Sequence, residues 1–191
     1  MILNYYRRLK QEIPENVWLF LKKALILFVV WKLLYHLVLY PIRQPDKWLS
    51  TTTTDASGYF LSLINAHVSM EVIEQRSIDP YNNREIIKTE LWLNKKKAVR
   101  VGDGCNALEL YVIYMCFLIA FWKNWKDFIL FSIIGVISIF IINTLRIAGL
   151  GWVSLYAKKW FEFLHGYAFK IIVYTQIILL WILYAKKGEK S

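Results

Sequence analysis

Four long apolar runs divide the chain. They cover residues 17–40, 107–122, 128–145 and 166–185. A helix rises 1.5 Å per residue, so about 18 to 20 residues cross the hydrocarbon layer of a bilayer, which is roughly 30 Å thick. The second run reaches that length only when Cys105 and Asn106 begin its helix. The pattern predicts an all-α integral membrane protein with about four transmembrane helices.

The first run is compatible with either a signal peptide or a membrane anchor. Its apolar core, residues 24–40, lies well beyond the charged N-terminal stretch, and no small-residue cleavage site follows Tyr40. We therefore expect an uncleaved anchor. The run also contains Lys32 and His36, which are candidates to line a cavity or to meet Glu109.

Basic residues in the short flanks predict the orientation of the spans. The N-terminal flank, the turn after the second run and the C-terminal tail together hold ten Lys and Arg residues. The short segment after the third run holds only Lys158 and Lys159. Both termini are therefore expected in the cytoplasm, with residues 41–104 outside it.

This orientation divides the chain into four parts. We expect a cytoplasmic N-terminus with the first helix, an extracytoplasmic segment, a catalytic membrane core and a cytoplasmic tail, at residues 1–40, 41–104, 105–185 and 186–191. In the extracytoplasmic segment, residues 51–54 form a short polar tract. Residues 86–93 and 98–101 alternate like strands around Asn94-Lys95-Lys96-Lys97, which predicts a small hairpin, and residues 79–83 resemble a turn before it.

Composition excludes several other classes of protein. The chain has 24 Lys and Arg against 14 Asp and Glu, a formal charge of +10 that ordinarily suggests a nucleic-acid partner. Yet 57% of its residues are hydrophobic and nine are Trp, so the charge is better explained by membrane topology. Two cysteines are too few for a disulfide scaffold. We expect no nucleic acid, no cofactor and no metal site.

The predicted topology brings three polar residues to one membrane depth. Cys105 precedes the second span, Arg146 ends the third and His165 precedes the fourth, all at the outer face. Imidazole can take the proton of a thiol, and the thiolate can attack a carbonyl. A neighbouring Arg can lower the thiol pKa or bind a developing oxyanion. Singly, each residue has an ordinary alternative, as a packing cysteine or as interface anchors.

Other polar residues of the membrane core are weaker candidates. Glu109 lies four residues after Cys105, so on one helix both would face the same way. It could pair with Arg146 or orient His165, although a water-exposed interfacial Glu is the favoured interpretation. Asn143 lies about one turn before Arg146 and could bind the substrate backbone or join helices.

Two further segments complete the expectations for the membrane core. Residues 147–164 are expected to form an amphipathic interfacial segment that could cover the site. Cys116 lies 11 residues after Cys105. On one helix the two would be about 16 Å apart, too far for a disulfide, so Cys116 is expected to be packing only.

Three local patterns resemble the exosortase family, multispan membrane cysteine transpeptidases that include archaeosortase. The patterns are Val99-Arg100-Val101-Gly102-Asp103-Gly104-Cys105-Asn106, Asn143-Thr144-Leu145-Arg146-Ile147, and His165 at the head of the last span. Their order and spacing match the family over residues 90–184, and the compact size resembles the small exosortase F type. The chain has Ala107 and Gly166 where the family commonly has Gly and an acidic residue.

The resemblance implies an enzyme of the bacterial inner membrane with its active site at the outer face. Its substrates would be exported proteins with a C-terminal tripartite signal, which is a short motif, an apolar helix and a basic cluster. Cys105 would be the nucleophile, His165 the general base and acid, and Arg146 the electrostatic stabiliser. The resulting thioester would pass to an amine or hydroxyl acceptor, on an envelope lipid or sugar.

Two other functions stay open from sequence. One is a non-catalytic membrane adaptor in which Cys105, Arg146 and His165 only pack and anchor. The other is a small transporter subunit with Lys32, His36 and Glu109 along a proton path, which is weaker because these groups lie at different depths.

Overall fold

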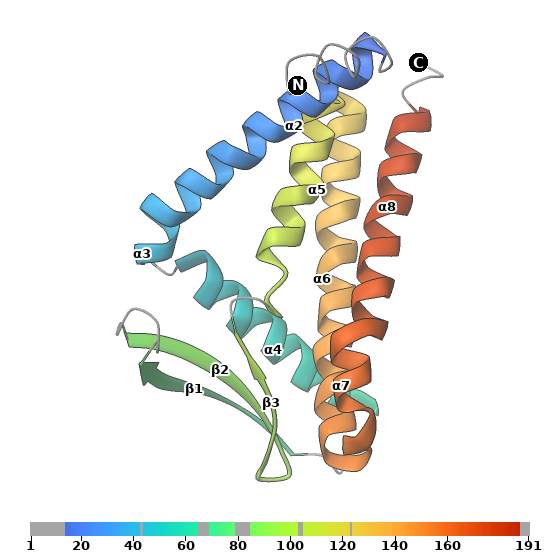
Figure 1. Ribbon diagram of the computed structural model, residues 1–191. Helices are drawn as coiled ribbons and strands as arrows, with labels where there is room; N and C mark the ends of the chain where they lie inside the picture. Colours follow the sequence, from blue (N-terminus) through green and yellow to red (C-terminus); the bar gives the residue numbers. More distant parts are fainter. Residues whose placement is uncertain are drawn as a thin grey trace, which may run out of the picture.

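The computed structural model describes residues 14–42, 44–64, 69–78, 85–102, 105–122 and 124–187. A bundle of long helices carries a small three-stranded sheet at one end (Figure 1). The start of α2 (Glu15–Leu34) and the end of α8 (Phe169–Lys187) lie together at the other end (Figure 1). This arrangement puts the two ends of the described chain on the same side of the bundle.

Three stretches of helix are long and apolar enough to cross a membrane, so this is a multi-pass membrane protein. The first is Val17–Ile42, which comprises most of α2, the π-helical turn η1 (Tyr35–Leu39) and α3 (Tyr40–Ile42). The others are α6 (Trp125–Tyr156) and the stretch Lys158–Lys187.

The second predicted span corresponds to α5 (Leu108–Ala120), and its 13 helical residues rise only about 20 Å. The helix does not begin at Cys105 because Ala107 adopts a left-handed conformation, with φ of 66°. The chain from Cys105 to Ala107 is not α-helical, so helix length does not confirm the count of four membrane helices.

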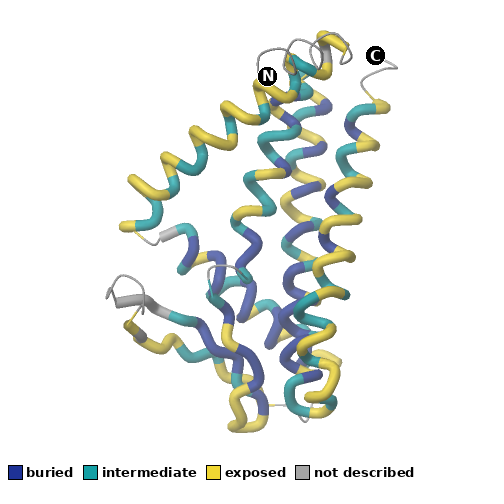
Figure 2. Tube along the Cα trace, viewed as in Figure 1, coloured by how far each residue is buried: buried dark blue, intermediate teal, exposed yellow. Residues whose placement is uncertain are grey.

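Helix α6 continues well beyond the predicted end of the third span. It runs unbroken for 32 residues to Tyr156, so the expectation of an interfacial segment from residue 147 is wrong for its first ten residues. The reason is that Ile147, Ala148 and Leu150 pack into a protein core with the sheet, which replaces lipid as their apolar environment. Figure 2 shows this part of α6 as largely buried, whereas α2 is exposed or half-buried along its length.

The chain reverses direction after α6 through a series of short turns. A 3₁₀ turn η3 (Lys158–Trp160) leads into α7 (Phe161–Phe163) and the π-helical turn η4 (Leu164–Ala168), and α8 follows. Helices α5, α6 and α8 then share a second apolar core that includes Tyr114, Ile139 and Ile177.

Helix α4 (Gln44–Ile64) occupies the segment between the first span and the sheet. The sequence predicts no helix here because its Ser and Thr tract is polar. In the structure, Thr53, Thr54 and Ser57 are buried, and each hydroxyl donates to the backbone carbonyl four residues earlier. Those bonds satisfy the hydroxyls inside the fold. Ser57 also donates to the carbonyl of Thr144 at 2.9 Å, which joins α4 to α6.

The sheet has the order β1-β2-β3 and is antiparallel, with strands β1 (Met70–Ile78), β2 (Glu85–Leu93) and β3 (Lys96–Val101). The predicted hairpin is confirmed as β2 and β3. Its turn residues Asn94 and Lys95 have φ of 51° and 60°, the two left-handed positions of a type I′ turn. The turn predicted at residues 79–83 lies outside the described residues.

Candidate active site

The structure brings Cys105, Arg146 and His165 to the wall of one cavity of about 480 Å³. Cys105 follows β3, Arg146 lies on α6, and His165 lies in the turn η4 before α8. Most of the remaining wall is apolar and comes from β3 and α6. It includes Ala98, Val99, Val101, Ile147 and Leu150. Three elements that are distant in sequence thus build one site.

Cys105 lies in a short turn between β3 and α5, where its N–H donates to the carbonyl of Gly102 at 2.8 Å. The sequence predicts that Cys105 and Glu109 face the same side of one helix. This prediction is wrong because the helix begins only at Leu108. Cys116 lies within α5 as expected, and both cysteines are free thiols.

Asn143 holds the backbone of Cys105 in place. Its Nδ2 donates to the carbonyl oxygen of Cys105 at 3.1 Å, and the side chain is only 1% exposed. Of the two expected roles, this contact agrees with Asn143 joining parts of the chain, and a hydrogen bond to a substrate stays a prediction. Its Oδ1 is buried and accepts no hydrogen bond from any described residue.

The residue after Cys105 is held from the opposite side. Asn106 is fully buried and donates to Asp46 Oδ1 at 2.9 Å, while its own Oδ1 accepts the N–H of Leu108 at 3.0 Å. Tyr35 donates to the other oxygen of Asp46 at 2.9 Å. The sequence does not predict these contacts. The one feature that could have indicated them is the position of Asn106 directly after Cys105.

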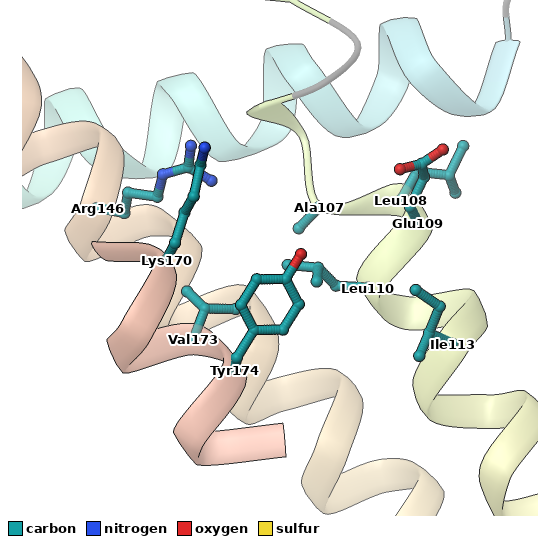
Figure 3. A pocket seen from close by; sticks show the side chains of 9 residues that line it. All are labelled: Ala107, Leu108, Glu109, Leu110, Ile113, Arg146, Lys170, Val173 and Tyr174. Atoms are coloured by element: carbon teal, nitrogen blue, oxygen red, sulfur yellow. The ribbon is translucent and has the colours of Figure 1, made fainter. Parts of the chain in front are cut away.

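Arg146 is 8% exposed, and its guanidinium makes no hydrogen bond or ion pair with any described residue. A buried cation is costly without a countercharge. Arg146 lines the cavity of Cys105 and also a second pocket of about 120 Å³ (Figure 3). A negative charge that develops in either space would therefore be stabilised.

His165 lies in the π-helical turn η4, a type of distortion that is common at functional sites. Its ring stacks on Phe161 with centroids 5.8 Å apart and planes 10° from parallel. Neither ring nitrogen bonds to another described residue, so both are available to a thiol or a substrate.

Glu109 forms an ion pair with Lys32 at 2.9 Å, which confirms the expectation that Lys32 meets it. Glu109 lines the second pocket together with Arg146 but does not line the cavity of Cys105 and His165. His36 instead packs its ring against Tyr35 and Tyr40. Among the described residues no cluster of His, Cys, Asp or Glu could hold a metal ion.

The sheet wall of the cavity is fixed by one buried carboxylate. Glu90 on β2 accepts hydrogen bonds from Lys97, from Arg100 at 2.9 Å and from Trp92 at 3.2 Å. Burial alone would raise the pKa of Glu90, but these hydrogen bonds and the charge of Lys97 lower it overall. Lys97 and Arg100 also line the cavity, so the Glu90 contacts hold its cationic rim.

Comparison with known proteins gives one match. The comparisons with curated proteins and with solved structures return none. The sequence model described as transmembrane exosortase matches residues 16–182, which covers the first span, the sheet, the cavity and most of α8. That match extends over most of the chain and includes Cys105, Arg146 and His165, and the protein therefore belongs to the transmembrane exosortase family.

Proposed function

We propose that the protein is a membrane-embedded cysteine transpeptidase or peptidase that cleaves a C-terminal sorting signal of exported proteins. The observation that carries this proposal is the convergence of Cys105, Arg146 and His165 on one cavity. Membership of the exosortase family supports a membrane transpeptidase. We further propose the small exosortase F type, in keeping with the compact chain.

The first half-reaction forms a thioester. His165 takes the proton of the Cys105 thiol, and the thiolate attacks the carbonyl carbon of the scissile peptide bond. Arg146 stabilises the negative oxygen of the tetrahedral intermediate. The carbon–nitrogen bond then breaks as His165 returns the proton to the leaving amine, and the substrate remains joined to the sulfur of Cys105.

The second half-reaction releases the substrate. An amine or hydroxyl of an envelope lipid or sugar attacks the thioester carbonyl and gives its proton to His165. The carbon–sulfur bond breaks, and the Cys105 thiolate is restored and reprotonated. Water in place of the acceptor would make the enzyme a peptidase.

Strand β3 offers a place for an extended substrate segment. It is the last strand of the sheet, and its five consecutive residues from Lys97 to Val101 line the cavity beside Cys105. A free strand edge can pair with an extended peptide through main-chain hydrogen bonds. We propose that the short motif of the sorting signal binds along this edge and so presents its peptide bond to Cys105.

The length of α6 gives the distance of the site from the end of the bundle at which α2 begins and α8 ends. Asn143, which bonds to Cys105, lies 18 residues after Trp125, about 27 Å along α6. The hydrocarbon core is about 30 Å thick, so Cys105 lies near its far boundary when Trp125 marks the near one. With the predicted orientation this boundary is the outer face of the bacterial inner membrane. A peptide bond just outside the helix of a substrate would meet Cys105 there.

The test follows processing of a sorting-signal substrate from the same organism in cells that carry Cys105→Ala or Cys105→Ser. Both variants are expected to abolish processing, whereas the control Cys116→Ala processes normally. In addition, hydroxylamine should release the substrate from a thioester adduct of the wild-type protein. No such adduct should form with Cys105→Ala.

Normal processing by both Cys105 variants would refute the enzyme and favour the adaptor. Expression and membrane insertion of each variant are checked by immunoblot, so that loss of the protein is not mistaken for loss of activity.

A further inference from the structure

The pocket on the other side of Arg146 concentrates positive charge. Arg146 and Lys170 line it together with Tyr174, and Figure 3 shows the guanidinium, the lysine side chain and the phenol directed toward the same space. Neither cation forms an ion pair or hydrogen bond with a described residue. Glu109, the one carboxylate in the lining, pairs with Lys32 at 2.9 Å.

Two neighbouring cations without a countercharge repel each other, and for Arg146 burial adds to the cost. An anion between them would remove both penalties. A phosphate suits this place because it accepts hydrogen bonds from a guanidinium, an ammonium and a phenol at the same time.

The depth of the pocket points to a lipid as the source of that phosphate. We place one boundary of the membrane at Trp122, Trp125 and the ion pair between Lys187 and Asp127, because Trp and charged residues are typical of the membrane–water interface. Arg146 lies 21 residues after Trp125, about 32 Å along α6, just beyond a hydrocarbon core of roughly 30 Å. The phosphate groups of the opposite leaflet lie at this level.

The shape of the pocket fits an amphiphile. Below the cations, the walls are apolar and come from Leu110, Ile113 and Val173 (Figure 3). Its volume of about 120 Å³ is too small for a substrate helix but can take one small polar group. An acyl chain could continue along the exposed apolar side of α8, which includes Ile171.

We propose that Arg146 and Lys170, with Tyr174, form a phosphate-binding site for the headgroup of an anionic phospholipid of the outer leaflet. The site depends on the membrane position of the bundle but not on the proposed peptidase chemistry. It also gives Arg146 a bound anion on the side away from Cys105.

The test measures lipid retention by the purified full chain with native mass spectrometry. Phosphatidylglycerol, phosphatidylcholine and inorganic phosphate are added separately. Wild type is expected to retain phosphatidylglycerol in preference to phosphatidylcholine, whose choline adds a cation. Lys170→Gln should reduce that retention at least fivefold, Lys170→Arg should keep it, and the matched control Lys158→Gln should leave it unchanged.

Equal retention by wild type and Lys170→Gln overturns the proposal. Binding of inorganic phosphate without retention of phosphatidylglycerol overturns the lipid assignment. Thermal unfolding followed by tryptophan fluorescence shows whether each variant is folded, and retention by Lys170→Arg separates a lost charge from a lost fold. Cys105→Ala should retain lipid like wild type, so a failure of the lipid site and a failure of the proposed activity are distinguishable.

Discussion

Two buried asparagines hold the chain next to Cys105 through hydrogen bonds to other parts of the protein. Asn143 on α6 binds the carbonyl of Cys105, and Asn106 binds Asp46 on α4. Reaction rates depend steeply on the alignment of reacting atoms, so residues that fix the nucleophile influence the rate without touching the substrate. If Cys105 is the nucleophile as proposed, both asparagines are positioning residues.

Replacement of Asn143 by Leu should lower the processing rate about 10- to 100-fold, because Cys105 loses its anchor to α6. The rate constant should fall more than the Michaelis constant rises, which a loss of substrate binding would not produce. Single-turnover processing of a purified substrate measures this split.

The control is Thr144→Val on the same helix. The hydroxyl of Thr144 is buried but bonds to no described residue, so its removal should leave activity nearly unchanged. An equal loss in both variants would mean that α6 itself is damaged and would contradict a specific role for Asn143.

Glu90 makes the stability of the sheet dependent on pH. Its pKa is lower in the folded protein than in the unfolded chain, so its charged form stabilises the fold. That contribution is complete above the ordinary carboxyl pKa and is lost as the pH falls through the lowered value. Glu90→Gln should cost about 1–3 kcal/mol at neutral pH, with the difference from wild type vanishing in acid.

Thermal unfolding of both proteins between pH 3 and pH 7 measures the effect. A difference that stays constant across this range would show that the charge of Glu90 is not responsible.

At the scale of elements, α5 and α6 approach each other at Gly135. A Cβ added there would lie 2.0 Å from the ring of Tyr114, whose hydroxyl donates to the carbonyl of Phe131 at 2.8 Å. Gly135→Ala must push the helices apart or displace the ring, and should destabilise the protein by about 1–3 kcal/mol.

Thermal unfolding in detergent is the measurement, with Gly166→Ala as the control. No atom of the described residues lies within 4 Å of a Cβ built at Gly166. If both variants unfold at the wild-type temperature, the close approach of α5 and α6 is contradicted.

In the hairpin turn between β2 and β3, a substitution should stabilise the protein. Lys95 holds a left-handed φ of 60°, a conformation that costs a non-glycine residue about 1–2 kcal/mol. Asn-Gly is the preferred pair for a type I′ turn. Lys95→Gly should therefore raise the unfolding temperature slightly, whereas Lys96→Gly within β3 should lower it. A fall for Lys95→Gly would argue against this turn geometry.

Both ends of the described chain should lie on the cytoplasmic side, because α2 begins and α8 ends at the same end of the bundle (Figure 1) and the basic flanks predict that this side is cytoplasmic. A reporter that is active only outside the cytoplasm should be active when inserted at Lys95 and inactive when fused after Lys187. Activity at both positions, or only after Lys187, would contradict the orientation. Wild-type processing by each fusion would confirm that the protein still folds.

The sequence pattern predicts three long apolar helices, the hairpin, and the meeting of Cys105, Arg146 and His165, because each depends on periodicity or on span order. It does not predict α4, whose buried hydroxyls are satisfied by the backbone of their own helix. Nor can an apolar stretch distinguish lipid from a protein core, which is why the continuation of α6 beyond Arg146 is missed.

Whether Cys105 and Glu109 face the same side depends on the backbone conformation of Ala107 between them. Its left-handed φ cannot be predicted from an alanine. The contact between Asp46 and Asn106 joins residues 60 positions apart, so only the folded chain brings them together.

Because α6 is one unbroken helix from Trp125 through Arg146 to Tyr156, the distance between any two of its residues along the bundle is fixed. The number of residues between its first turn and Asn143 sets how far Cys105, the proposed nucleophile, lies from the opposite end of the bundle. A substrate anchored by its own helix would then be cut only if its sorting motif reaches that height. Lengthening or shortening the substrate helix by one turn, about 5 Å, should move the motif away from Cys105 and reduce cleavage, although the motif itself is unchanged.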